Sequence, residues 1–278
     1  MQATSAMQAT SRESLRTVRE WFESMIREAD DSTLRTLGDE LSAVARLLNT
    51  ERLLRRHLAD SSTSREAREG LVDQLLSGQV GDRTLDALRR VAAARWSRSV
   101  DLLNTVELLG RLPLLAIAER AGNADEIEDE LFRFARIVEV EPRLERLLTD
   151  ESTPEQQRES LLDDLVADKV RPATRALLVQ VIASPRGRRL DSVVAEVAEL
   201  AAARRDESVA HVRAAAELTD EQERRLADVL SRIYGRRVMV RVELDPDVVG
   251  GLVIRIGDEV IDGSVASNLA KARQELLG

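Results

Sequence analysis

The chain has 278 residues, a net charge of -9 and 43% hydrophobic residues, with only 2% aromatic. It contains no cysteine, which excludes disulfides, thiolate metal sites and cysteine nucleophiles. No apolar run reaches the roughly 18 residues that a membrane span needs, so we expect no membrane-spanning helix. Acidic residues outnumber basic ones, so we expect no nucleic-acid partner.

The first residues, MQATSAMQATS, lack the charged start and apolar core of a signal peptide and are typical of a disordered leader or of a linker. Apolar residues then recur at helical spacing as far as residue 205. The predicted helices cover 11–29, 33–49, 51–59, 64–77, 82–94 and 97–110, and then 112–122, 125–139, 141–148, 154–167, 172–184 and 188–205. Breaks are expected at Gly78, Gly81, Gly122 and Pro185. Helices this short are marginal alone, so they must pack into bundles.

An internal repeat relates the two sets of helices. Residues 39–101 align without a gap on 129–191, at an offset of 90, and roughly a third of the pairs are identical. Matched pairs include Ala45 with Ala135, Arg46 with Arg136, Leu58 with Leu148, Asp60 with Asp150, Leu71 with Leu161, Asp73 with Asp163, Thr84 with Thr174, and Val91 with Val181. A gapless register of this length predicts a duplicated bundle in which helices and core positions correspond.

Each copy carries a capping-box motif before its fourth helix. The motifs run from Thr63 to Glu66 and from Thr153 to Gln156. In each, a threonine oxygen can accept from a backbone amide while the Glu or Gln side chain reaches back. Pro154 is expected at the first helical position, where its missing N–H costs nothing.

The pattern changes after Glu207. Residues 208–218 are compatible with a strand or with irregular structure. A third capping box, from Thr219 to Gln222, opens a helix that Gly235 is expected to end. One face of this helix is predicted to carry Leu226, Val229, Leu230 and Ile233.

Strands and one more helix complete the prediction. Val238, Val240, Val242 and Leu244 alternate with Met239, Arg241 and Glu243, which indicates a half-buried strand. Further strands are predicted over 252–256 and 260–261, joined by a tight turn at Gly257-Asp258, and a final helix carries Val265, Leu269, Ala272 and Leu276. We therefore predict a mainly α fold with two tandem helical bundles and a small α/β domain, divided at 1–110, 111–205 and 206–278.

Signals for catalysis are missing from the sequence. The glycines match neither a phosphate-binding loop nor a dinucleotide-binding fingerprint and are interpreted as turns and bulges. His57 and His211 are the only histidines; His57 aligns with Leu147 and is expected at a core edge. Acid pairs on the helices are interpreted as solvated faces, Ser264 as a helix cap, and the two tryptophans as core anchors. We expect no catalytic, cofactor or metal site.

A distinctive series of residues lies in segment 229–277. It comprises Gly250-Gly251-Leu252, then Gly257-Asp258, then Ile261-Asp262-Gly263-Ser264. In order and spacing the segment resembles the C-terminal domain of the delta subunit of F-type ATP synthase, the OSCP family. Residues 112–205 resemble the helical domain of that family, although an aromatic residue often follows the proline that stands here at Pro113. The first copy resembles the enlarged delta region of some high-GC Gram-positive bacteria, including forms fused behind a b-type stalk subunit. The resemblance is compatible both with a separate delta subunit and with the delta portion of such a fusion.

The resemblance implies a non-catalytic peripheral-stalk, or stator, subunit that joins the catalytic head to the b stalk at the cytoplasmic face of the cell membrane. It implies that an N-terminal helix of an alpha subunit docks between the first and fifth helices of the second bundle, near Leu114, Ala118, Leu177 and Val181. The C-terminal module would hold b. The alternative is a soluble helical adaptor or regulatory protein unrelated to ATP synthase, which would not co-purify with alpha and b chains.

Overall fold

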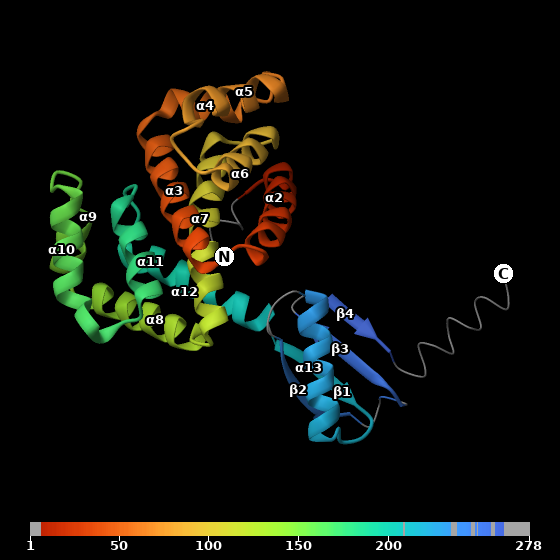
Figure 1. Ribbon diagram of the computed structural model, residues 1–278. Helices are drawn as coiled ribbons and strands as arrows, with labels where there is room; N and C mark the ends of the chain where they lie inside the picture. The colour runs from red at the N-terminus through yellow and green to blue at the C-terminus, as the bar shows by residue number, and fades with distance from the viewer. Residues whose placement is uncertain are drawn as a thin grey trace. The chain divides into compact units, whose positions relative to one another are not determined.

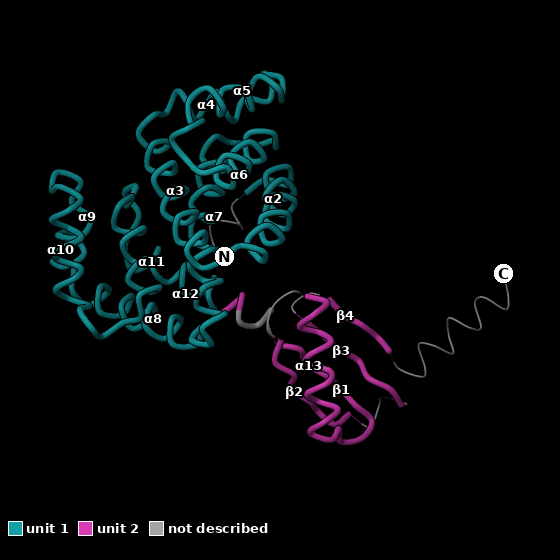
Figure 2. Tube along the Cα trace, viewed as in Figure 1, with its two compact units in different colours: residues 1–201 teal, residues 202–278 magenta. Residues whose placement is uncertain are grey.

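A computed structural model describes residues 7–207, 209–234, 238–245, 248, 250–256 and 259–263. The chain divides into two compact units, Met1–Ala201 and Ala202–Gly278 (Figure 2). The first is helical and the second combines one described helix with a four-stranded sheet (Figure 1). The predicted fold class, mainly α with a small C-terminal α/β part, is confirmed.

The helices of the first unit follow the predicted ranges closely, with one exception described below. They are α2 (Ala9–Arg27), α3 (Asp31–Thr50), α4 (Arg52–Ala59), α5 (Arg65–Leu76), α6 (Asp82–Ala93), α7 (Ser99–Ala121), α8 (Ala124–Val140), α9 (Pro142–Thr149), α10 (Glu155–Val166), the 3-10 turn η1 (Ala167–Lys169), α11 (Pro172–Ala183) and α12 (Leu190–Glu207). We call α2 to α7 the first bundle and α7 to α12 the second bundle.

The duplication is visible in the helix boundaries. Helices α9, α10 and α11 begin and end at the positions of α4, α5 and α6 shifted by 90. Side-chain contacts repeat as well. Glu40 accepts hydrogen bonds from Gly81 N and from Thr84 Oγ1, and Glu130 accepts from Arg171 N and Thr174 Oγ1. Equivalent core positions therefore carry equivalent polar networks in both bundles.

The predicted break between 97–110 and 112–122 is wrong, because α7 runs without interruption through Pro113. Proline removes one helical hydrogen bond, so an interior proline usually ends or kinks a helix. Here residues 112–116 are all buried, and packing on several sides outweighs the local preference. The helix ends, as predicted, at Gly122, which adopts the left-handed conformation with φ of 73°.

Helix α7 supplies side chains to two hydrophobic cores. Leu102, Leu103 and Leu112 belong to the core of the first bundle, whereas Leu114 and Leu115 belong to that of the second. The proposed boundary after residue 110 therefore falls inside a helix shared by both bundles. The three-part division of the chain stays a prediction.

The first two predicted caps differ from the structure. Helix α5 is capped by Ser64, not Thr63, and the Ser64 oxygen accepts from Ala67 N at 3.2 Å. Pro154 is itself the N-cap residue of α10, which has no side-chain cap. The third motif is confirmed in both directions: Thr219 N donates to Gln222 Oε1 at 2.9 Å, and Gln222 N donates to Thr219 Oγ1 at 3.3 Å.

The second unit contains β1 (Val209–Ala214), α13 (Asp220–Tyr234), β2 (Met239–Leu244), β3 (Leu252–Ile256) and β4 (Glu259–Asp262), in the sheet order β2-β1-β3-β4. Strand β1 resolves the ambiguity of 208–218. It pairs parallel with β2, as a crossover through α13 requires, and antiparallel with β3. The predicted hairpin is confirmed by the antiparallel pairing of β3 and β4.

Burial corrects three predictions in this unit. Leu226 and Leu230 pack into its core, but Val229 and Ile233 of α13 are 40% and 63% exposed, and Leu244 is 52% exposed. Only one face of α13 lies against the sheet, and Val229 and Ile233 fall outside that face. Leu244 is the last residue of β2, an edge strand of the sheet. The predicted cap Gly235, the turn Gly257-Asp258, Ser264 and the final helix lie outside the described residues.

Candidate docking surfaces

The four residues predicted to receive the alpha helix are buried. Leu114 and Ala118 on α7, and Leu177 and Val181 on α11, join one hydrophobic core and are between 0% and 4% exposed. They do lie between the first and fifth helices of the second bundle. They form its packed interior, so a helix docked over this seam would contact half-buried neighbours such as Ala176.

Helix α3 crosses α7 beside this seam at a pair of glycines. A Cβ on Gly38 would lie 3.2 Å from Gly110 O, which is too close for any larger residue without a shift. Gln180 of α11 donates from Nε2 to Gly38 O at 3.3 Å and to Gly110 O at 3.2 Å. These hydrogen bonds join the Gln180 end of α11 to α3 and α7. A docked partner helix could therefore contact only the rest of the seam between α7 and α11.

An apolar strip on α8 escaped the sequence analysis. Phe132 is 54% exposed and Val140 is 70% exposed, and the Arg136 guanidinium lies 5.9 Å from the centre of the Phe132 ring. At the offset of 90, Phe132 corresponds to Ser42 of α3. The alignment of the two copies contained a sign of this strip. A serine in one copy and a phenylalanine in the other indicate that this helix face has different neighbours in the two bundles.

The face of α3 that corresponds to this strip is an internal contact. Arg46 of α3, the counterpart of Arg136, pairs with Glu155 of α10 at 3.8 Å. The two bundles therefore meet through α3. The equivalent surface of α8 meets no described residue that covers Phe132 or Val140.

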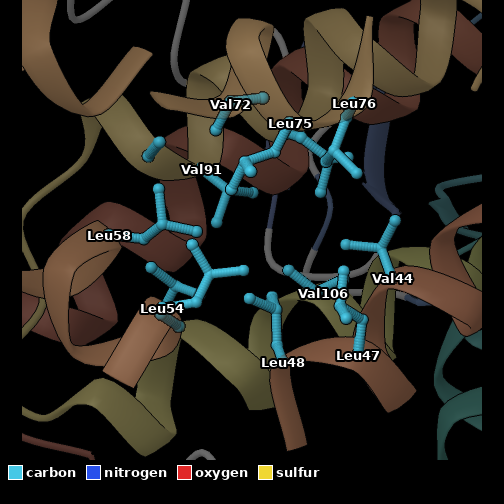
Figure 3. A pocket seen from close by; sticks show the side chains of 13 residues that line it. Val44, Leu47, Leu48, Leu54, Leu58, Val72, Leu75, Leu76, Val91 and Val106 are labelled. Atoms are coloured by element: carbon cyan, nitrogen blue, oxygen red, sulfur yellow. The ribbon is translucent and has the colours of Figure 1, made fainter. Parts of the chain in front are cut away.

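The first bundle contains an apolar pocket between α3, α4, α5, α6 and α7 (Figure 3). Its lining is hydrophobic throughout, and its cavity volume is about 20 Å³, which is room for about one water molecule. Leu47 and Leu75 line it and are 39% and 45% exposed, so the pocket is reached from solvent.

The glycine motif of the second unit shapes the sheet. Gly250 and Gly251 adopt positive φ angles of 70° and 78° before β3, a conformation that other residues rarely take. Gly263 N donates to Leu252 O at 2.9 Å, and a Cβ there would lie 3.3 Å from the same oxygen. Ile261 and Asp262 lie on β4. The described motif residues therefore have a structural role in the hairpin.

No three potential metal ligands lie together in the described part of the chain, and no described helix is long and apolar enough to cross a membrane. His57 on α4 and His211 on β1 are both exposed and belong to different units.

Comparisons with known proteins agree with this description. Residues 113–276 match the family model described as ATP synthase delta (OSCP) subunit. Two relatives, both called ATP synthase subunit b-delta, come from Mycobacterium sp. strains KMS and JLS. Each is 48% identical over 272 residues, which cover 98% of this chain and 61% of the relative. The chain thus spans less than two thirds of their length.

Among solved structures, a chain of the Toxoplasma gondii mitochondrial ATP synthase hexamer is 22% identical, with a TM-score of 0.28 over 60% of this chain and 95% of that one.

Proposed function

Because the chain belongs to the ATP synthase delta (OSCP) subunit family, we propose that it is a non-catalytic peripheral-stalk subunit of a rotary F-type ATP synthase. It links the catalytic alpha/beta head to a b-type stalk, so that proton-driven rotation is coupled to ATP synthesis. Its place is at the cytoplasmic face of the cell membrane. Its likeness to b-delta proteins supports the further proposal that it is the delta portion of such a polypeptide.

The observation that carries this function is the division into two separately packed units. The helical unit has its own cores, and the α/β unit has another built around Val212 and Leu230. Each unit also exposes large apolar side chains, such as Phe132 in one and Ile233 in the other. A connector under torque needs two joints, and two linked contacts reinforce each other through effective concentration.

Truncation tests the role of the second unit. A chain ending at Glu207 retains every helix of the first unit, so it should remain helical by circular dichroism and still bind a peptide of the alpha amino-terminal helix. Membranes carrying it should lose gradient-driven ATP synthesis while ATP hydrolysis by the head persists. The comparison is made at equal expression with the intact chain. Normal synthesis by the truncated form would show that the second unit is not the stalk joint.

Two substitutions distinguish the possible sites of the alpha helix on the second bundle. We propose the seam of α7 and α11, where Ala176 is half-buried at the surface. Ala176→Glu should weaken peptide binding by roughly 10- to 100-fold, because it places a charge in an apolar contact. Phe132→Ser on α8 is the matched control and should leave the titration unchanged. The reverse result would move the alpha site to the α8 strip.

A further inference from the structure

The α8 strip has a counterpart elsewhere in the same chain. The strip comprises Phe132, Arg136, Ile137 and Val140. At the offset of 90, its phenylalanine and its first-named arginine correspond to Ser42 and Arg46 of α3. The α3 face is in contact with helices of the second bundle, whereas the α8 face is exposed. The chain therefore shows, in one of its two copies, how this helix face can be covered.

Two contacts describe the covering of α3. Arg46 Nε pairs with Glu155 Oε1 of α10 at 3.8 Å, and Glu155 is the first residue of that helix. Gln180 of α11 donates from Nε2 to Gly38 O at 3.3 Å. Ser42, one turn before the arginine, is half-buried. The arginine of α3 thus faces a helix that carries a carboxylate in its first turn.

The arginine of α8 has the same arrangement without that carboxylate. Arg46 Nη1 donates to Ser42 Oγ at 3.3 Å, and the Arg136 guanidinium lies 5.9 Å from the centre of the Phe132 ring. Each arginine therefore lies beside the residue one turn before it. The Arg136 guanidinium forms no hydrogen bond or ion pair with any described residue. An acidic side chain from outside the described part of the chain would complete the contact that α3 already has.

The difference between the two copies is in their apolar surface. Phe132 replaces Ser42 and Val140 replaces Thr50, and Ile137 extends the surface along α8. The three apolar side chains of α8 are 54%, 70% and 51% exposed, in that order of mention. Large apolar side chains grouped on one face of a helix are typical of a surface that receives an amphipathic helix. The α8 strip therefore combines an apolar surface with an arginine that lacks an acidic partner among the described residues.

A second copy of this chain cannot cover the strip with the helices that cover α3. Glu155 is paired with Arg46 of its own chain, and Gln180 is bonded to Gly38. Both helices are thus engaged within the molecule. This favours a different protein chain as the occupant of the strip.

We propose that the α8 strip docks an amphipathic helix of a partner chain. An Asp or Glu in the first turn of that helix pairs with Arg136, as Glu155 pairs with Arg46, and its apolar side chains pack against Phe132 and Val140. A half-exposed ion pair contributes little affinity and mainly fixes the register, so the apolar contact supplies most of the binding. The strip is separate from the seam of α7 and α11, and this inference does not depend on the proposed stalk function.

Thiol labelling tests whether the strip is covered. The chain has no cysteine, so Val140→Cys introduces a single thiol on the strip. In the isolated full chain it should react with a maleimide as fast as Ser160→Cys, at an exposed position of α10. In the assembly that purifies with the tagged chain from its native host, labelling of Val140→Cys should slow by roughly tenfold or more, because an interface centre excludes water. Ser160→Cys is the matched control and should keep its rate.

Charge reversal tests the chemistry of the occupant. In the assembly, Arg136→Glu should speed labelling of Val140→Cys by about fivefold or more, because like charges then face each other. Arg136→Lys keeps the charge and should retain the protection. Photo-crosslinking from p-benzoylphenylalanine at position 132, followed by mass spectrometry, identifies the partner segment. That segment should be an amphipathic helix with Asp or Glu in its first turn, and changing this acid to Arg should restore protection to Arg136→Glu.

Four results would overturn the proposal. Equal labelling rates of Val140→Cys in the isolated chain and in the assembly would mean that no partner covers the strip. Slow labelling in the isolated chain would mean that another part of this chain covers it. A crosslink to a second copy of this chain would identify the wrong occupant. Unchanged protection in Arg136→Glu would show that no carboxylate faces the arginine. The alpha peptide titration described above tests the stalk function separately.

Discussion

Single side chains hold the loop before the fifth helix of each bundle in the same way. Glu40 and Glu130 each accept from a backbone N–H and from a threonine hydroxyl, and the threonines are buried. A buried acceptor that loses its donor costs more than the bond itself contributes. The repetition of this contact is therefore a structural requirement of the bundle.

Replacing the buried threonine tests that requirement. Thr174→Val removes one donor to Glu130 at nearly constant volume and should destabilise the chain by about 1–3 kcal/mol. Thr84→Val is the matched change in the first bundle and should cost a similar amount. Urea unfolding measures both. An unchanged midpoint for either variant would mean that its glutamate finds another donor.

The N-cap of α3 makes stability depend on acid pH. The backbone N–H of Thr33, and then the Ser32 hydroxyl, stabilise the Asp30 carboxylate and lower its pKa to about 2. In the unfolded chain this pKa is about 3.9. The carboxylate therefore contributes stability that is fully present above about pH 4 and is lost as the pH falls through about 2.

Side-chain NMR titration measures this prediction directly. Asp30 should titrate near pH 2, whereas Asp39 on the same helix should titrate above its usual value, because burial raises its pKa. Asp30→Ala should be less stable than the parent chain at pH 6, and the difference should shrink toward pH 2. A normal titration of Asp30 would show that its cap bonds do not form in solution.

Residue-level prediction from sequence succeeded where one arrangement was available and failed where two competed. Thr219 and Gln222 had no rival and form the expected reciprocal cap. Thr63 and Ser64 are adjacent hydroxyl residues, either of which can cap, and the chain uses Ser64. The burial of Leu114 and Ala118 could not be predicted from the spacing of apolar residues, because a helix shared by two cores has no single apolar stripe.

At the scale of elements, the crossing of α3 and α7 depends on the absence of side chains. Gly38 and Gly110 let the two backbones approach, and Gln180 links both carbonyls to α11. The sequence offered no sign of this contact, because a glycine within a helical pattern does not reveal which helix it meets. The continuity of α7 was hidden for a similar reason, since Pro113 signals a break locally and only packing overrides it.

Alanine substitutions at two helical glycines separate packing from helix propensity. Gly70→Ala in α5 meets no atom within 4 Å and should stabilise the chain by about 0.5–1 kcal/mol. Gly38→Ala places its Cβ 3.2 Å from Gly110 O and should destabilise by roughly 1–3 kcal/mol, because the crossing must widen. Thermal unfolding measures both. Equal gains at the two sites would contradict the close crossing.

At the scale of the molecule, the shared helix determines where the chain can be divided. A fragment ending at residue 110 loses Leu112 and Ala116, which are buried in the core of the first bundle. The two-bundle organisation itself was predictable, because a gapless offset preserves core spacing. The sharing of α7 by both bundles was not predictable. The alignment shows which residues correspond in the two copies, but it does not show whether one helix belongs to both bundles.

Fragments test this organisation. Residues 1–121 should be more stable than residues 1–110 by roughly 2–5 kcal/mol, because the longer fragment keeps the buried side chains at the end of α7. Urea unfolding followed by circular dichroism compares them. Equal midpoints would support a boundary at residue 110 and two independent bundles.

Sharing α7 has a consequence for how such chains grow. At the offset of 90, α2 and α12 both fall on the residues of α7, so the last helix of one bundle is also the first of the next. A further 90-residue segment added in this register brings four new α-helices and a new terminal helix, and it needs no additional linker. Gene duplication with its boundary inside this helix can therefore lengthen the protein in steps of 90 residues. Each step ends in a helix that can serve as the first helix of another bundle.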